Sequence, residues 1–171
     1  MLLILRGVSN SFKSSFSKRF PHQQIVSLDE LRIKMLDDVG CMDYADEISS
    51  VFNAILNSRL RLKADTVIDN TNLSLLLIDK LVDKAINSNN EFLILSFKRE
   101  IGECIAGNRL RSLEDSKHFV PSDVIMRQFD SYQKHTPQIR EKYSDSFYEF
   151  NVSNDDIDEI YKKYLKIRKE L

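Results

Sequence analysis

Short apolar runs with strong β-propensity alternate along this chain with longer amphipathic segments, and this alternation limits the fold more than any other property of the sequence. The first run, Met1–Arg6, is apolar up to its last residue, as is typical of a strand buried on both faces of a sheet. Tyr44–Lys63 carries apolar residues at helical spacing. Strands alternating with helices predict a parallel sheet covered on both faces, an α/β fold with ligands at the carboxyl ends of the strands.

The pattern predicts a five-stranded parallel sheet flanked by helices. The expected strands are Met1–Arg6, Gln24–Leu28, Asp65–Asn70, Glu91–Phe97 and Tyr148–Val152. The expected helices are Lys13–Phe20, Asp29–Asp37, Tyr44–Lys63, Leu73–Asn87, Glu100–Arg111, Ser122–Tyr132 and Asn154–Arg168. A length of 171 residues fits one domain, so we expect residues 1–171 to form a single unit with a helical lid at about residues 108–121.

Composition excludes several classes of protein. The formal net charge of −1 produces no strong field toward nucleic acid or membrane. The longest apolar runs, Met1–Leu5 and Leu75–Ile78, are far shorter than the ~20 residues of a membrane span, and no secretory signal is recognisable. Cys41 and Cys104 do not form a disulfide framework. We therefore expect a soluble cytoplasmic protein with reduced thiols and no membrane partner.

The segment Gly7–Ser15, which follows the first strand, is close to the phosphate-binding loop pattern G-x-x-x-x-G-K-[ST]. Gly7, Lys13 and Ser14 match the pattern, and Phe12 stands where the second glycine belongs. Backbone amides of such a loop wrap a phosphate, Lys13 would bridge the β- and γ-phosphates of ATP, and Ser14 would ligate Mg²⁺. The expected nucleotide contacts are Gly7, Ser9, Asn10, Ser11, Phe12, Lys13, Ser14 and Ser15.

Phe12 is the main departure from this pattern. A bulky residue held at an unusual φ costs about 1–3 kcal/mol. Either the ring points away from the phosphates or the loop binds nucleotide poorly. The alternative interpretation of Gly7–Ser15 is an ordinary turn between a strand and a helix.

Two other segments carry candidate site residues. Asp29 and Arg32 are three residues apart at a helix start, so both lie on one helix face. Asp69 and Asn70 end the third predicted strand, where an α/β active site would lie. Taken singly, Asp29 is also explained as a helix N-cap, and Asp69-Asn70 as a turn.

Together these segments resemble the P-loop kinases of the polynucleotide 5′-hydroxyl kinase type (the AAA-type zeta/polynucleotide kinase-like ATPase family) in order and spacing. The matching segments are Gly7–Ser15, Ser27–Arg32, Val67–Ser74 and Asn108–Pro121, within a resemblance that spans Met1 to Tyr132. Its more specific parts are the sequence IDNTNLS after the third strand and NRLR…FVP in the lid region. Asn10 also replaces a glycine that is usual in this family.

The resemblance implies roles for individual residues. Asp29 matches the general base that takes the proton from the 5′-hydroxyl, and Arg32 matches the arginine that holds the substrate phosphate. Asp69 matches the acid that orients this arginine, and Asn72 belongs to the same substrate-orienting segment. In the lid, Arg111 matches an arginine that contacts the transferring phosphate; Arg109 is a second lid candidate for the nucleotide.

The function expected from this resemblance is ATP- and Mg²⁺-dependent transfer of a phosphoryl group to the 5′-hydroxyl end of DNA or RNA, as in nucleic-acid repair. The lid is acidic at Glu114 and Asp115, which favours a different acceptor: a nucleoside, a modified DNA base or a small metabolite. A further alternative, motivated by Phe12, is a binding protein without turnover. His118, within the lid, is the histidine nearest to this chemistry. The choice between ATP and GTP, and the oligomeric state, stay open.

Overall fold

A computed structural model gives the fold, and it describes residues 1–39, 41, 43–114, 119–153 and 156–170. Its centre is a five-stranded sheet in the order β2-β3-β1-β4-β5. All neighbouring strands are parallel, which confirms the predicted fold class. The strands are β1 (Leu2–Arg6), β2 (Ile25–Val26), β3 (Thr66–Asp69), β4 (Phe92–Lys98) and β5 (Phe147–Asn151).

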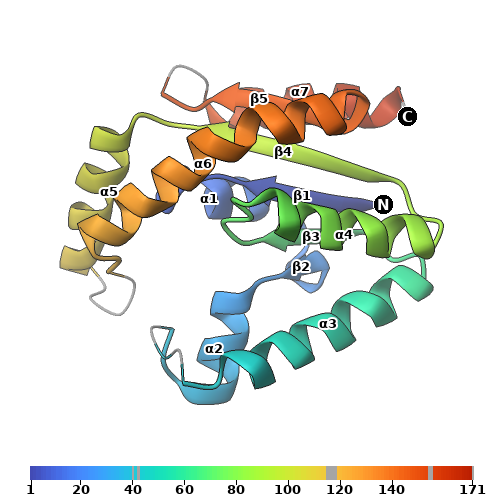
Figure 1. Cartoon of the computed structure of the whole chain (residues 1–171), viewed down its shortest axis with the longest axis horizontal. Coiled ribbons are helices and arrows are strands. Elements are labelled where there is room, and N and C mark those ends of the chain that lie inside the picture. The colour runs from blue at the N-terminus through green and yellow to red at the C-terminus, as the bar shows by residue number, and fades with distance from the viewer. Residues whose placement is uncertain (40, 42, 115–118, 154–155, 171) are drawn as a thin grey trace.

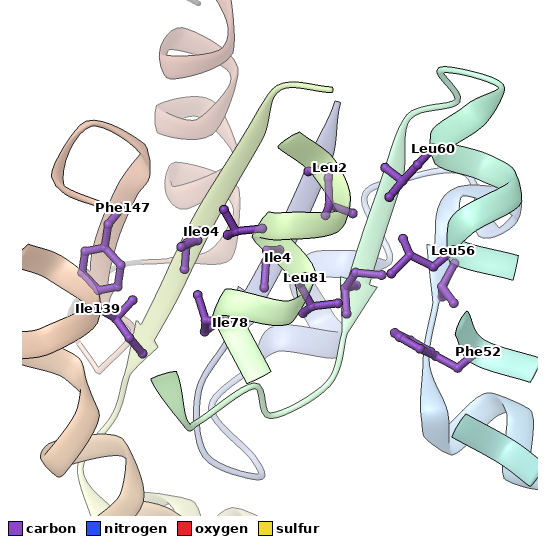
Figure 2. Close-up of a cluster of buried hydrophobic side chains, with 14 of the residues drawn as sticks. Leu2, Ile4, Phe52, Leu56, Leu60, Ile78, Leu81, Ile94, Ile139 and Phe147 are labelled. Atoms are coloured by element: carbon purple, nitrogen blue, oxygen red, sulfur yellow. The ribbon is translucent and has the colours of Figure 1, made fainter. Parts of the chain in front are cut away.

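Helices cover both faces of the sheet, because the side chains of the central strand alternate between two apolar layers. Leu2 and Ile4 face a core completed by α2 (Leu28–Leu36), α3 (Ala45–Arg61), α4 (Leu75–Asn87) and α6 (Ser122–Lys142), part of which Figure 2 shows. Leu3 and Leu5 face a second core with α1 (Lys13–Ser17) and α7 (Ile157–Lys169). The uninterrupted apolar run Leu2–Leu5 of β1 follows from this double burial.

A third apolar cluster lies beyond the carboxyl ends of the strands. It joins Val8 and Leu73, which follow β1 and β3, to Cys104 of α5 (Ile101–Glu114) and to Ile125 and Tyr132 of α6. Helix α5 and the first half of α6 therefore lie together at one end of the sheet, opposite the N-terminus (Figure 1). None of the helices in the described ranges has the length and apolar character of a membrane span.

Several element boundaries differ from the prediction. Helix α1 ends at Ser17 instead of Phe20, because a tight turn with bonds from Arg19 N to Phe16 O and from Phe20 N to Ser17 O replaces its last turn. Strand β2 has only two residues.

The two lid-side helices are longer than predicted. Helix α5 reaches Glu114, three residues beyond the expected end at Arg111. Helix α6 continues past Tyr132 to Lys142 although Pro137 lies inside it. A proline removes a helical N–H and disfavours such a continuation.

Polar side chains hold the buried side of the turn of α6 that precedes this proline. The Tyr132 carbonyl accepts a bond from Thr136 Oγ1 at 2.5 Å and another from Arg6 Nη2 at 3.0 Å. Arg6 Nη1 also donates to Thr136 Oγ1 at 2.9 Å. These contacts hold the turn in place on the side that faces the sheet.

Arg6 is a fully buried cation at the end of β1. Besides its contacts with α6, the guanidinium donates to Ser96 Oγ of β4 and to the Leu73 carbonyl, and it lies over the Tyr132 ring at 4.2 Å. Burial lowers the pKa of Arg6 to about 10. A single side chain thus connects two strands, the segment after β3, and α6.

We predict that Arg6→Met destabilises the fold by about 2–4 kcal/mol, because the substitution leaves several buried acceptors without a donor. Urea unfolding monitored by circular dichroism measures the change. Arg127→Met is the matched control, since this arginine is 72% exposed on α6, and it should cost less than about 0.5 kcal/mol. Equal effects of the two substitutions would contradict the bridging role.

Candidate active site

The loop Gly7–Phe12 connects β1 to α1 at the carboxyl edge of the sheet. Ser11 N donates to Val8 O at 3.1 Å, which curls the loop back on itself. At Gly7, a Cβ atom would lie 2.5 Å from Ser11 Oγ and 2.8 Å from the Phe97 carbonyl. Only glycine fits this close approach, so the first glycine of the motif is a steric requirement of the loop.

Asn10 and Phe12 adopt the left-handed backbone conformation, with φ of 63° and 65°. These are the two positions at which the loop pattern and the resembling kinases place glycine. The loop therefore keeps the backbone conformation of a glycine-containing loop, and the positive φ of Phe12 costs energy, as expected from the sequence. The Phe12 ring is 40% exposed and packs against the guanidinium of Arg99, which follows β4.

Lys13 is buried inside this loop, with 6% of its surface exposed. Its ammonium donates to Val8 O at 2.8 Å and to Ser11 Oγ at 3.3 Å. Burial lowers the pKa of Lys13 to about 8, against the opposing effects of Asp69 and Asp29. A cation held in this way would gain from the arrival of an anionic ligand at the loop.

The segment after β3 holds the loop by backbone contacts. The Thr71 carbonyl accepts from Gly7 N at 3.0 Å. Asn72, with φ of 46° and 5% exposure, donates from Nδ2 to the Leu5 carbonyl at 2.7 Å. The structure thus uses the Asn72 side chain to support the end of β1, whereas we had expected it to orient a substrate.

Asp69 and Asn70, the two residues before Thr71, bond to helices α1 and α2. Asp69 Oδ2 accepts from Ser17 Oγ at 2.8 Å, which ties the carboxylate to α1. Asn70 Oδ1 accepts from Leu28 N at 2.9 Å and so caps the first turn of α2. The sequence IDNTNLS therefore links β1, the loop, α1 and α2 through successive residues.

Asp29 and Arg32 lie on one face of α2, as predicted, and Arg32 Nη1 donates to Asp29 Oδ1 at 2.7 Å. The Asp29 side chain is 66% exposed and that of Arg32 only 13%. The expected orienting contact between Asp69 and Arg32 does not occur; Asp69 bonds to Ser17 instead. Asp29 is nevertheless close enough to Lys13 to affect its pKa.

The two ends of the lid are joined by one buried side chain. Asn108 of α5 donates from Nδ2 to Val120 O at 2.6 Å and accepts from Val120 N at 3.1 Å. The same amide oxygen lies 3.3 Å from Asn10 Nδ2 of the loop. Gln128 of α6 accepts from Ser9 N at 2.9 Å. Sequence reasoning did not assign Asn108 and Gln128, although Asn108 begins the NRLR segment.

Arg109 and Arg111 are exposed on α5. The charge of Arg111 contributes to lowering the pKa of Lys13, which places it within electrostatic reach of the loop. The central lid residues 115–118, including Asp115 and His118, lie outside the described residues, and the Glu114 side chain is not described.

The residues present fit a magnesium nucleotide. Ser14 and Ser15 are exposed at the start of α1, and Asp69 is tied to the same helix by Ser17. Hydroxyl and carboxylate oxygens are the ligands that Mg²⁺ prefers, and Mg²⁺ usually completes its shell with phosphates and water. Within the described part of the chain, no three His, Cys, Asp or Glu residues cluster as an all-protein metal site.

Solved structures share this architecture. A chain of the Pnkp1/Rnl/Hen1 RNA repair complex matches with a TM-score of 0.71 and 23% identity, over 80% of this chain and 45% of that chain. This protein thus spans less than half of that relative.

Two other solved structures match over nearly their whole length. A gluconokinase from Sinorhizobium meliloti 1021 matches with a TM-score of 0.62 and 19% identity, over 96% of this chain and 89% of its own. Kti12 from Chaetomium thermophilum, in complex with ADP-AlF3, matches with a TM-score of 0.66 and 14% identity, over 95% and 98%. Identities this low show the fold alone.

The sequence itself matches a family over most of its length. Residues 2–135 match the AAA domain family AAA_33. No curated protein matches the chain significantly. The match includes the loop, the segment after β3, α2 and both ends of the lid. This chain, a P-loop kinase-like domain built on a parallel five-stranded sheet, therefore belongs to the AAA domain family AAA_33.

Proposed function

We propose that this protein is an ATP-dependent kinase that transfers the γ-phosphoryl group to a hydroxyl, with the 5′-hydroxyl end of DNA or RNA as the favoured acceptor. The observation that carries the proposal is the burial of Lys13 inside a loop that keeps the backbone course of a phosphate-binding loop. Asp29 and Arg32 lie on α2, which follows β2, and only β3 separates β2 from β1 in the sheet. The charge of Asp29 also affects the pKa of Lys13, so the proposed donor and acceptor groups lie near each other.

The donor side would use the loop amides and Lys13 to hold the β- and γ-phosphates of ATP. On binding, the Lys13 ammonium would exchange its bond with the Val8 carbonyl for phosphate oxygens. Ser14 would contribute its hydroxyl to Mg²⁺, and the metal supplies charge neutralisation on the phosphates when bound. Arg111, with Arg109 beside it, would approach the phosphates from the lid.

The acceptor side would use Asp29 as the general base. Its carboxylate is exposed and can reach an acceptor hydroxyl, while Arg32 beside it offers a cation for an acceptor phosphate. Support for a polynucleotide comes from the resemblance of the lid and of IDNTNLS to polynucleotide kinases, and from the RNA repair complex among the structural neighbours.

A small hydroxylated acceptor is the second candidate. The gluconokinase among the structural neighbours, the net charge of −1 and the acidic residues Glu114 and Asp115 favour it. A binding protein without turnover is the third candidate, because Phe12 adds strain to the loop.

We predict that labelled γ-phosphate passes from ATP to 5′-hydroxyl oligonucleotides and that Asp29→Asn reduces the rate about 10²–10⁴-fold, because the general base is lost. The panel contains 5′-hydroxyl DNA, 5′-hydroxyl RNA, nucleosides and gluconate. Asp123→Asn is the matched control, since Asp123 is exposed on α6 and pairs with Arg127. Transfer to small acceptors alone would establish the second candidate. Absence of transfer to every acceptor, with no thermal stabilisation by Mg·ATP, would favour the third, because a ligand that binds only the folded protein must raise its Tm.

Salt dependence separates a polynucleotide from a small acceptor. A substrate held through several phosphates releases counterions on binding, so the KM for an oligonucleotide should rise steeply between about 50 and 200 mM salt. The KM for a nucleoside should stay nearly constant over the same range. A flat profile for the oligonucleotide would contradict recognition of its phosphate backbone.

Lys13 gives nucleotide binding a pH dependence. Its pKa of about 8 in the free protein lies below the ordinary value of 10.5, and only the protonated form attracts phosphate. The Kd for Mg·ATP should therefore change little below pH 8 and should rise up to about tenfold per pH unit above it. Isothermal titration calorimetry between about pH 7 and 9 measures this trend. Lys13→Arg keeps its charge and should flatten the profile; the same rise in both proteins would exclude Lys13 as its source.

A further inference from the structure

Two residues of the phosphate-binding loop have backbone conformations that are unfavourable for residues other than glycine. Asn10 and Phe12 both have φ near +65°, a region that glycine enters freely and that a phenylalanine avoids. Both residues carry a Cβ atom, so this conformation costs energy at each of them. Contacts from outside the loop can offset that cost.

Arg99 contacts both strained residues. It follows β4, and its side chain is 15% exposed. Arg99 Nη1 donates to the Asn10 carbonyl at 2.6 Å, and the guanidinium carbon lies 4.1 Å from the centre of the Phe12 ring. One planar group thus bonds to the backbone at the first left-handed position and stacks on the side chain at the second.

The surroundings of Arg99 keep its guanidinium in this place. Arg99 Nε donates to Oε2 of Glu103, in the first turn of α5, at 3.3 Å. At Gly107 a Cβ atom would lie only 3.3 Å from Arg99 Nη1, so the absence of a side chain there leaves room for the guanidinium. The contact with Glu103 also offsets the positive charge of Arg99, which favours a structural role in the loop over attraction of phosphate.

We propose that Arg99 is a positioning residue that takes over the function of the two missing glycines: its stacking on Phe12 and its bond to the Asn10 carbonyl hold the loop in the phosphate-binding conformation. The inference rests on the nucleotide-binding function proposed above. It assigns to Phe12 a purpose that a glycine could not serve, because the ring is the surface on which Arg99 stacks.

The test is a comparison of Arg99→Ala in two loop backgrounds. In the natural loop, Arg99→Ala should raise the Kd for Mg·ATP about tenfold, because a stacked cation and a charged hydrogen bond are lost. In a loop carrying Asn10→Gly and Phe12→Gly, the same substitution should change the Kd less than about twofold, since glycines adopt the conformation unaided. Arg99→Lys keeps the charge but should raise the Kd in the natural loop nearly as much as Arg99→Ala does, because lysine lacks the planar group.

Hydrogen exchange of the amides of residues 9–14 in nucleotide-free protein is a second, independent readout. Arg99→Ala should accelerate exchange in the natural loop, whereas the control Arg127→Ala should leave it unchanged. An equal loss of affinity in both backgrounds would overturn the proposal, because Arg99 would then bind nucleotide directly. Unchanged exchange in the natural loop would also overturn it. If the natural protein binds no Mg·ATP, the proposed function fails, and the exchange experiment still decides the role of Arg99.

Discussion

The burial of the Arg6 guanidinium is the constraint on which the arrangement of the site depends. A buried cation is costly unless its donors are satisfied. Arg6 satisfies four of them on groups from β4, the segment after β3, and α6. These elements must therefore converge at the end of β1. The phosphate-binding loop begins at the next residue, so the same convergence positions the loop between α6 and the segment after β3.

The loop and the lid consequently behave as one packed unit. Val8 shares an apolar cluster with Cys104 of α5 and Ile125 of α6. Asn10 contacts Asn108, which joins the two ends of the lid. A change in the loop on binding of an anion would be transmitted to the lid through these contacts, because packed side chains do not deform independently. Helix α5, which carries Arg109 and Arg111, therefore packs directly against the loop.

The fold could be predicted from the sequence because it depends on local patterns. The apolar run of β1 and the helical spacing in α3 were sufficient for the α/β class and the parallel sheet. The length of α6 could not be predicted, since Pro137 is a local signal to end a helix, whereas the contacts that anchor the preceding turn come from Arg6, 130 residues before Thr136. Such long-range polar contacts leave no local sequence signal.

The candidate site likewise contains residues that could be predicted from the sequence and residues that could not. Lys13 and the positions of Asp29 and Arg32 were predictable, because motif and helical periodicity identify them. The role of Asn72 was not, since whether an amide faces a ligand or a strand end depends on its backbone angles. The sequence indicated Arg99 only as part of a possible basic patch with Lys98, Arg109, Arg111 and Arg32, and its contact with the Phe12 ring could not be predicted. Its partners are far away along the chain, and an arginine that stacks on a ring has no characteristic spacing.

The donor and acceptor halves of the site differ in how firmly the fold specifies them. The proposed donor half rests on buried groups: Gly7 in a space that excludes a side chain, Lys13 inside the loop, and Asn72 behind it. In the proposed acceptor half, the Asp29 carboxylate is exposed beside the largely buried Arg32. Buried contacts tolerate few substitutions, while exposed side chains change at little cost to stability. Solved structures named for an RNA repair complex, a gluconokinase and Kti12 can therefore share this sheet at 23% identity or less. Under the proposed function, the acceptor of this chain would be selected by groups on α2, and the fold that it shares with these structures does not reveal it.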